Sequence, residues 1–141
     1  MNKKNIGKFG FTISDNEVLG AEVEGEHNRL LKVFLSPEVG NYEDATVLIS
    51  DIQPGKSTGM HTHESNEIMF VAEGQGYKVC GGKKHFINKG SIMLAPKNVD
   101  HNIVNEGNDI MRLFCVYIPP IDTSGKFEEA TKNMKEKFER M

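Results

Sequence analysis

Residues 55–74 read GKSTGMHTHESNEIMFVAEG, and three side chains of this stretch bind transition metals well: His61, His63 and Glu67. Because side chains two positions apart on a strand share a face, His61 and His63 are expected to point inward together. Residues 64–66 are polar and suit a turn, after which Glu67 opens the next strand. The carboxylate of Glu67 is therefore predicted to return beside the two imidazoles.

A second stretch, residues 90–105, reads GSIMLAPKNVDHNIVN and adds one more donor, His101. Its residues 96–100 form a predicted turn, and His101 begins the strand that leaves this turn. We interpret the two stretches as matching β-hairpins that pack opposite each other. The sequence thus predicts one divalent metal ion bound by His61, His63, Glu67 and His101. The other histidines, His27 and His85, lie outside both stretches and are expected to be ordinary loop and strand residues.

The rest of the chain has the pattern of short strands separated by turns. Runs rich in β-branched and aromatic residues alternate with turn sequences such as QPG, EGQG, NKG and NEGND. The predicted strands cover residues 29–35, 45–52, 67–72, 76–80, 84–88, 91–95, 101–105 and 110–118, with a further possible strand at 8–13. Regularly spaced short strands with no helix between them favour an antiparallel sandwich or barrel. We divide the chain into an N-terminal arm (1–28), an all-β barrel (29–120) and a C-terminal helix (121–141).

Length, charge and composition exclude several classes of protein. A chain of 141 residues is long enough to bury one core, and a net charge of −3 gives no support for nucleic-acid binding. No apolar run approaches the roughly 20 residues of a membrane helix. The N-terminal lysines precede no apolar segment, so no secretory signal is expected. Cys80 and Cys115 are not a Cys-x-x-Cys pair, and we expect reduced thiols in a cytoplasmic protein.

The last predicted strand has two apolar faces. One face carries Met111, Leu113, Cys115 and Tyr117, and the other carries Arg112, Phe114, Val116 and Ile118. The second face must therefore be covered, either by the C-terminal helix or by a second copy of the chain. After residues 122–124, which offer N-cap oxygens, a helix over 127–140 is predicted with an apolar stripe that packs on the sheet or across a dimer. The stripe is formed by Phe127, Ala130, Met134, Phe138 and Met141. The two-sided strand and the N-terminal arm together predict a homodimer.

The two stretches together resemble the motifs of a known protein family. Gly55, His61, His63, Glu67 and Gly74 have the spacing of the first motif of the cupin superfamily. Gly90, Pro96, Asn98, His101 and Asn105 resemble its second motif, with Asn98 where the family has glycine. Asparagine tolerates the left-handed backbone that a turn glycine supplies. The resemblance covers residues 29–118 and implies a double-stranded β-helix (jelly-roll) barrel. It also implies that His61, His63, Glu67 and His101 stand at the metal-binding positions.

Three imidazoles and one carboxylate leave about two open positions on a six-coordinate ion and suit Mn, Fe, Co, Ni, Cu or Zn. Two open positions let an oxygen-rich small molecule chelate the metal, which is compatible with dioxygenase, isomerase or lyase chemistry. Met60, Met69, Val71, Met93 and Ile103 predict a mostly apolar pocket, although the methionines could simply fill the core. No catalytic residue is assigned. The alternatives are a non-catalytic module that binds or senses a metabolite and a storage-like barrel.

Overall fold

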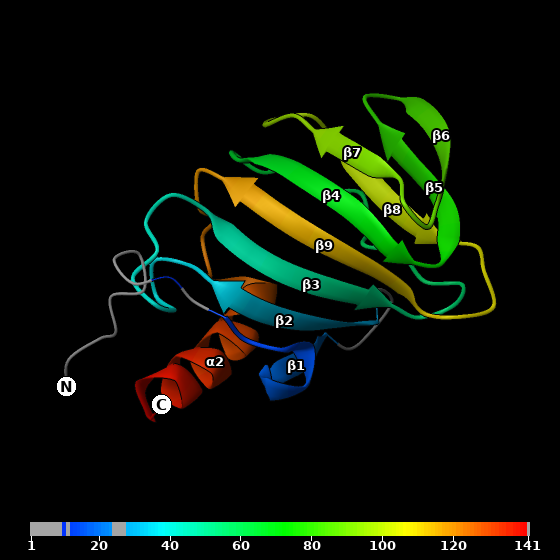
Figure 1. The fold of residues 1–141 in the computed structure, drawn as a ribbon. Coiled ribbons are helices and arrows are strands. Elements are labelled where there is room, and N and C mark those ends of the chain that lie inside the picture. Colours follow the sequence, from blue (N-terminus) through cyan, green and yellow to red (C-terminus); the bar gives the residue numbers. More distant parts are fainter. Residues whose placement is uncertain (1–9, 11, 24–27, 141) are drawn as a thin grey trace.

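The computed structural model describes residues 10, 12–23 and 28–140, and this part of the chain folds into two antiparallel sheets that face each other (Figure 1). The six-stranded sheet has the order β1-β2-β3-β9-β4-β7, and the three-stranded sheet has the order β6-β5-β8. The strands are β1 (Gly20–Val23), β2 (Arg29–Leu35), β3 (Thr46–Ile52), β4 (Asn66–Glu73), β5 (Gln75–Cys80), β6 (Lys83–Asn88), β7 (Ile92–Ala95), β8 (His101–Asn105) and β9 (Met111–Ile118). Helix α2 (Glu128–Arg140) follows the 3₁₀ turn η2 (Gly125–Phe127), and a further 3₁₀ turn, η1, covers Asp15–Glu17. The predicted jelly-roll barrel with a C-terminal helix is confirmed.

The predicted strands agree with the observed ones to within one residue at each end, because each has a clear alternation bounded by glycine, proline or asparagine. Strand β1 is the exception: it lies within the stretch that we expected to be an arm and pairs with β2. Its sequence GAEV has too few β-branched or aromatic residues to signal a strand. Most of the possible strand at 8–13 lies outside the described residues, and Gly10, Thr12 and Ile13 are not in a strand.

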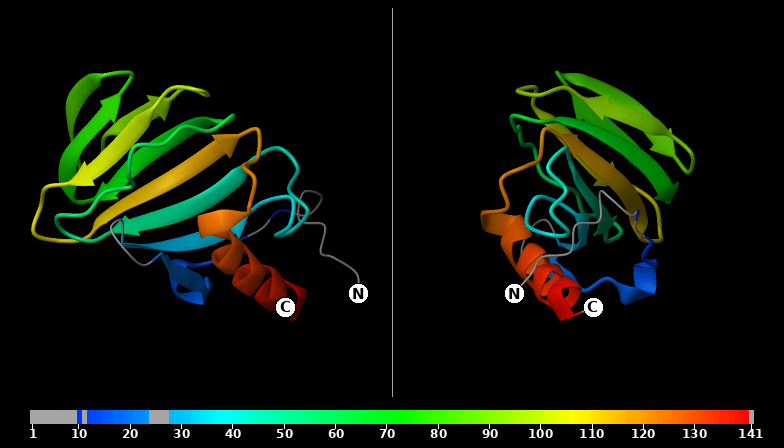
Figure 2. Two further views of the ribbon diagram at one scale, coloured as in Figure 1. Left: turned by 180° about the vertical axis from the view of Figure 1, so that it is seen from behind. Right: turned by 60° about the vertical axis from the view of Figure 1, so that its left-hand side comes forward.

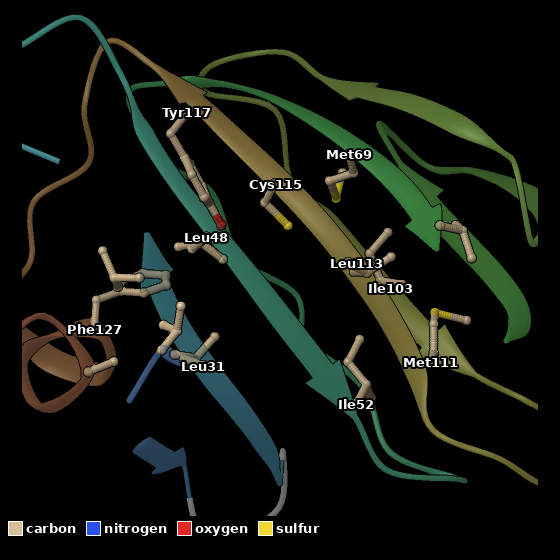
Figure 3. Packing of buried hydrophobic residues seen from close by; sticks show 14 of the residues in the cluster. Leu31, Leu48, Ile52, Met69, Ile103, Met111, Leu113, Cys115, Tyr117 and Phe127 are labelled. Atoms are coloured by element: carbon tan, nitrogen blue, oxygen red, sulfur yellow. The ribbon is translucent and has the colours of Figure 1, made fainter. Parts of the chain in front are cut away.

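The core lies between the two sheets and is built from the alternate residues that point inward. In β9 the inward residues Met111, Leu113, Cys115 and Tyr117 are all buried, as the alternation predicts. They meet Leu48 and Ile52 from β3, Met69 from β4 and Ile103 from β8 (Figure 3). Burial of these apolar side chains stabilises the fold.

Helix α2 packs beside the end of the six-stranded sheet, against β1 and β2 (Figures 1 and 2). Ala130, Met134 and Phe138 are buried in the same cluster as Leu31 of β2, and Phe127 lies against the Tyr117 ring with centroids 6.2 Å apart. The fifth residue of the predicted stripe, Met141, lies outside the described residues. Because the stripe joins the interior cluster, the suggestion that the helix covers the outward face of the last strand is wrong.

The prediction of two matching hairpins is also wrong. Strands β7 and β8 belong to different sheets, so the turn at residues 96–100 crosses from one sheet to the other. The segment before β4 joins β8 instead, through isolated bridges from Ser57 to Val104 and from His61 to His101. In a fold of two packed sheets, a turn that crosses from one sheet to the other leads to strands that pair with residues far apart in the sequence. Such pairing leaves no local sequence signal. Asn98, within the crossing turn, has φ 64°, the left-handed conformation expected at the position where the cupin motif has glycine.

Close approach of the chain explains one glycine of the three-stranded sheet. A β-carbon added at Gly76 of β5 would lie 1.9 Å from the carbonyl oxygen of Val104 on β8, so no side chain fits there.

Among the described residues, no helix is long and apolar enough to cross a membrane.

Candidate metal centre

The four predicted donors come from three parts of the chain and meet inside the barrel. His61 and His63 lie in the segment before β4, Glu67 is on β4 and His101 begins β8. One potential ligand atom from each of the four lies within 4.8 Å of the others. His61 and His101 oppose each other through two backbone hydrogen bonds of 3.0 and 2.9 Å, which fixes their relative position. Glu67 and His101 are buried, while His61 and His63 are half-buried toward an opening.

Backbone carbonyls orient all three imidazole rings. The Nδ1 atoms of His61, His63 and His101 lie 2.7, 2.7 and 2.9 Å from the carbonyl oxygens of Gly59, Ser65 and Val99. A carbonyl oxygen can only accept, so each Nδ1 carries the proton and donates it. In the neutral rings the Nε2 atoms are then free to bind a metal, which is the usual way that a second hydrogen bond sets the tautomer of a histidine ligand.

This arrangement fits a cation. The Nε2 atoms of His63 and His101 lie 3.1 and 3.3 Å from Oε1 of Glu67. If both rings are neutral, the lone pair of each Nε2 atom faces a carboxylate oxygen of Glu67, and the two repel each other. A proton or a metal ion between them removes this repulsion. The enclosed space beside them, lined by His61, Glu67 and His101 among others, measures about 10 Å³. That is about the size of one water molecule, and the donor set therefore fits one metal ion.

Hydrogen bonds determine the charges of the buried donors. Burial by itself would raise the pKa of Glu67, but hydrogen bonds from His101, His63 and Tyr117 hold that pKa well below its usual value. Burial lowers the pKa of His61 to about 4, so this ring is neutral at physiological pH. Burial also opposes the charged form of His101, but its hydrogen bonds to Glu67 and to the Val99 carbonyl, together with the charge of Glu67, raise its pKa. The cluster thus combines an ionised carboxylate with imidazoles, as a divalent ion requires.

The family model described as a cupin domain matches residues 48–117, about half of the chain, and this match contains all four donors. The chain belongs to the cupin superfamily. It is 26% identical to an uncharacterized protein of Methanocaldococcus jannaschii over 64% of this chain and 74% of that protein. It is 32% identical to L-ectoine synthase of Vibrio campbellii, covering 52% of this chain and 58% of the synthase. A crystal structure titled as a predicted oxalate decarboxylase from Thermotoga maritima superposes with a TM-score of 0.71 at 22% identity, covering 77% of this chain and 99% of that one.

Two further residues of this cupin touch the donor cluster, and neither was predicted from the sequence. The Tyr117 hydroxyl is hydrogen-bonded to Glu67, and the Tyr117 ring lies against that of His63 with centroids 5.2 Å apart. The Cys115 thiol also hydrogen-bonds to Glu67. Burial, followed by the charge of Glu67, raises the pKa of both groups, so both stay protonated and act as donors. Figure 3 shows both side chains on the same side of β9. The inward alternation of the last strand was the signal that could have identified them.

A larger cavity of about 700 Å³ lies outside the donor cluster and opens to solvent. His61 and His63 form part of its wall, together with Pro119 and Phe127 at the entrance to the C-terminal helix. Charged residues also line it: Glu64, Asp122 and Lys126.

The expectation of a mostly apolar pocket is wrong, because Arg29, Ser50 and Thr58 line the interior space together with the donors. Met69 and Ile103 lie beside the donors and Met93 is buried, whereas Met60 is 57% exposed. His85 is exposed on β6 as expected, and His27 lies outside the described residues.

Proposed function

We propose that this cupin binds one divalent transition metal through His61, His63, Glu67 and His101, and that it is an enzyme acting on an oxygen-rich small molecule that chelates this metal. The observation that carries the proposal is the convergence of three carbonyl-oriented imidazoles on one buried carboxylate, next to a cavity of about 700 Å³. Cavities of this size accommodate small metabolites. Relatives that are named as enzymes, including L-ectoine synthase, are consistent with the proposal.

A divalent metal held here supplies a Lewis acid, or with iron a redox centre, for dioxygenase, isomerase or lyase chemistry. The residues of the chain provide the surroundings. Gly59, Ser65 and Val99 orient the imidazoles through their carbonyls. Tyr117 and Cys115 hold the Glu67 carboxylate from the interior. Met69, Ile103 and Leu113 exclude water behind the donors, which strengthens the electrostatic interactions of the site.

A non-catalytic module that binds or senses a metabolite is the second candidate. One observation favours it: among the described residues of the interior cavity, Glu67, Tyr117, Cys115 and His101 are already engaged with one another by hydrogen bonds. None of these four groups is left over to move a proton to or from a substrate. The two candidates differ in turnover and not in metal binding.

The metal is tested first, by elemental analysis of protein purified without chelators and by titration of the metal-free protein with Mn, Fe, Co, Ni and Zn. We expect one ion per chain. His101→Ala is expected to lower the affinity for that ion at least 100-fold, because it removes the most buried imidazole. His85→Ala, which removes an exposed histidine outside the cluster, is the matched control and should bind metal as the wild type does. Equal metal uptake by the His101 variant would contradict the assignment.

Turnover is then measured with each metal restored, over a panel of keto acids, diols and uronates, by oxygen uptake and product analysis. Product formation that depends on metal and is lost in the His101 variant supports the enzyme. Background rates over the whole panel, together with saturable ligand binding, favour the binding module instead.

A further inference from the structure

Arg29 is a buried cation without a counter-ion in the described part of the chain. This first residue of β2 points into the barrel and is 4% exposed. One guanidinium nitrogen, Nη1, donates to the Ser50 hydroxyl at 3.3 Å, while Nε has no hydrogen-bond partner among the described residues. None of the ion pairs in that part of the structure involves Arg29. A buried charge that lacks a partner is costly, so the Arg29 guanidinium is a candidate for pairing with a ligand.

The position of Arg29 points to a ligand of the metal centre. Its side chain lines the same interior space as His61, Glu67 and His101. By contrast, the outward-facing Arg112 makes contacts of 2.8–3.1 Å with Asp51 and Asp15 and is complete without a ligand.

A second cation, Lys126, reaches the centre from the opening. Lys126 lines the outer cavity together with His61 and His63, and its ammonium lies 5.2 Å from the centroid of the Phe127 ring. Burial, followed by the charge of Arg29, lowers the pKa of Lys126 to about 8. The residue is exposed as a whole, so the ammonium remains accessible to a molecule in the cavity.

The charges around the donors are unbalanced once a metal is bound. A divalent ion and Arg29 together carry three positive charges in the interior, where Glu67 is the only carboxylate of the described residues that lines the space. Lys126 adds a further positive charge at the opening. Glu64 and Asp122 line the opening, but both are solvent-exposed, and Asp122 Oδ1 already accepts the backbone N–H of Ser124. Exposed carboxylates at the opening are screened by water and salt and do not neutralise the interior.

We propose that Arg29 and Lys126, which line two spaces that meet at His61, form an anion subsite at this junction. The subsite binds the carboxylate of the substrate while an adjacent oxygen of the same molecule binds the metal. This inference rests on the proposed function and narrows it. It selects α-keto and α-hydroxy acids from the oxygen-rich molecules that the metal alone would admit, and it disfavours neutral diols and sugars. Guanidinium groups suit this role because their planar donors match both oxygens of a carboxylate.

The experiment compares two probes of the same size, pyruvate and its neutral analogue hydroxyacetone, on Co(II)-loaded protein by visible absorption. We expect the wild type to prefer pyruvate. Arg29→Met should weaken pyruvate binding about 10- to 100-fold, as expected for a lost charge-assisted hydrogen bond, and Lys126→Met about 3- to 10-fold because its ammonium is more exposed. Hydroxyacetone binding should change less than about threefold in both variants. Lys132→Met, an exposed lysine of α2 outside both cavities, is the matched control and should behave as the wild type.

Two further measurements separate this subsite from a structural role of Arg29 and from the metal proposal. Without ligand, Arg29→Met should melt at the same or a higher temperature than the wild type, since it removes an unpaired buried charge. Arg29→Lys should recover part of the preference for pyruvate. Metal content is measured on the wild type and on every variant. A wild type that binds no metal would reject the metal centre. Pyruvate binding to the metal-free protein would still test the role of Arg29. Wild-type affinity for pyruvate in Arg29→Met, or an equal loss for both probes, would overturn the subsite.

A different observation, the outer face of the six-stranded sheet, supports a second inference. Neighbouring strands β7, β4 and β9 expose a continuous set of large apolar side chains there: Ile68, Phe70, Ile92, Leu94, Phe114 and Ile118. The register places Phe70 opposite both Ile92 and Phe114, so this outer patch is unbroken across the three strands. From the spacing of strands and residues, it measures roughly 15 Å by 20 Å, or about 300 Å². Patches of this kind mark interaction sites.

We infer that the outer patch is the centre of a homodimer interface in which a second copy covers it. The C-terminal helix cannot cover it, because its apolar side packs into the interior cluster beside β2. A two-fold axis matches an apolar patch with itself. A stable interface needs about 800 Å² per partner, so the patch would supply its apolar core and surrounding polar residues its rim.

Sedimentation equilibrium at micromolar concentration tests the dimer. The wild type should have twice the mass of the chain, and Phe114→Glu and Ile92→Glu should shift it to the monomer while keeping the native circular dichroism spectrum. Phe86→Glu, at an exposed phenylalanine on the three-stranded sheet, is the control and should remain dimeric. A monomeric wild type, or a dimer that survives both patch variants, would reject the inference.

Discussion

The inner and outer faces of the six-stranded sheet use the same residue types in opposite ways. Inside, the one hydrogen bond of the Arg29 guanidinium to a described residue is to the Ser50 hydroxyl, whereas outside the guanidinium of Arg112 pairs with Asp51 and Asp15. Inside, Leu113 is buried by the opposite sheet, whereas its outward neighbour Phe114 remains 40% exposed. On the outer face the charged groups are paired, while large apolar side chains are exposed. On the inner face the apolar side chains are buried, while Arg29 has no ion-pair partner among the described residues. This contrast is the basis of our two proposals, a charged ligand at the inner face and a second copy of the chain at the outer face.

The largest expected difference between the faces concerns stability. Leu113→Ala, on the inner face, should lower the free energy of unfolding by about 3 kcal/mol, because it leaves a cavity in a closed core. Ile92→Ala, at a residue 76% exposed on the outer face, should cost less than about 0.5 kcal/mol. Urea denaturation at low protein concentration measures both. Comparable losses would mean that the two faces are equally covered within one chain.

A smaller effect is expected from the hydrogen bond that joins the inner face to the donors. Tyr117→Phe removes the hydroxyl bound to Glu67 and keeps the ring packed against His63. We expect the affinity for metal to fall about 10- to 100-fold, as is found for other groups that hydrogen-bond to a metal ligand. Competition with a chromophoric chelator provides the measurement. Tyr77→Phe on the three-stranded sheet serves as the control, and an unchanged affinity in the Tyr117 variant would remove that residue from the site.

The smallest effect is expected at the ion-pair network of the outer face. Hydrogen bonds from Lys32 and then Arg112 lower the pKa of Asp15 below its ordinary value of 3.8. A lowered pKa means that this carboxylate stabilises the fold above about pH 4 and that the contribution disappears as the pH falls through the lowered value. Asp15→Asn should therefore cost less than about 1 kcal/mol at pH 7, and less at pH 2 than at pH 7. Thermal melts at the two pH values measure this, with exposed Asp44→Asn as the control, and a loss that is independent of pH would point to packing instead.

Much of the fold and of the donor cluster could be predicted because the signals are local. The spacing of His61 and His63, the turn before Glu67 and the glycine-like conformation of Asn98 each depend on a few consecutive residues. Alternation likewise identified the strands and placed Arg112 outside. The predictions that failed concerned which segments are neighbours in space: the two hairpins, the C-terminal helix as a cover for the last strand, and the N-terminal arm in place of β1. Those depend on pairings between residues far apart in the chain.

The sequence alone determined that four metal-binding side chains, at cupin spacing, belong to an all-β chain, because strand periodicity and turn chemistry are properties of short segments. Only the tertiary structure brought Tyr117 and Cys115 to Glu67, buried Arg29 without an ion-pair partner among the described residues, and placed α2 against β1 and β2 instead of over β9. The physical reason is the crossing of the chain between two sheets. This crossing brings together residues that are far apart in the sequence, and it decides which of the two apolar faces of a strand is enclosed between the sheets.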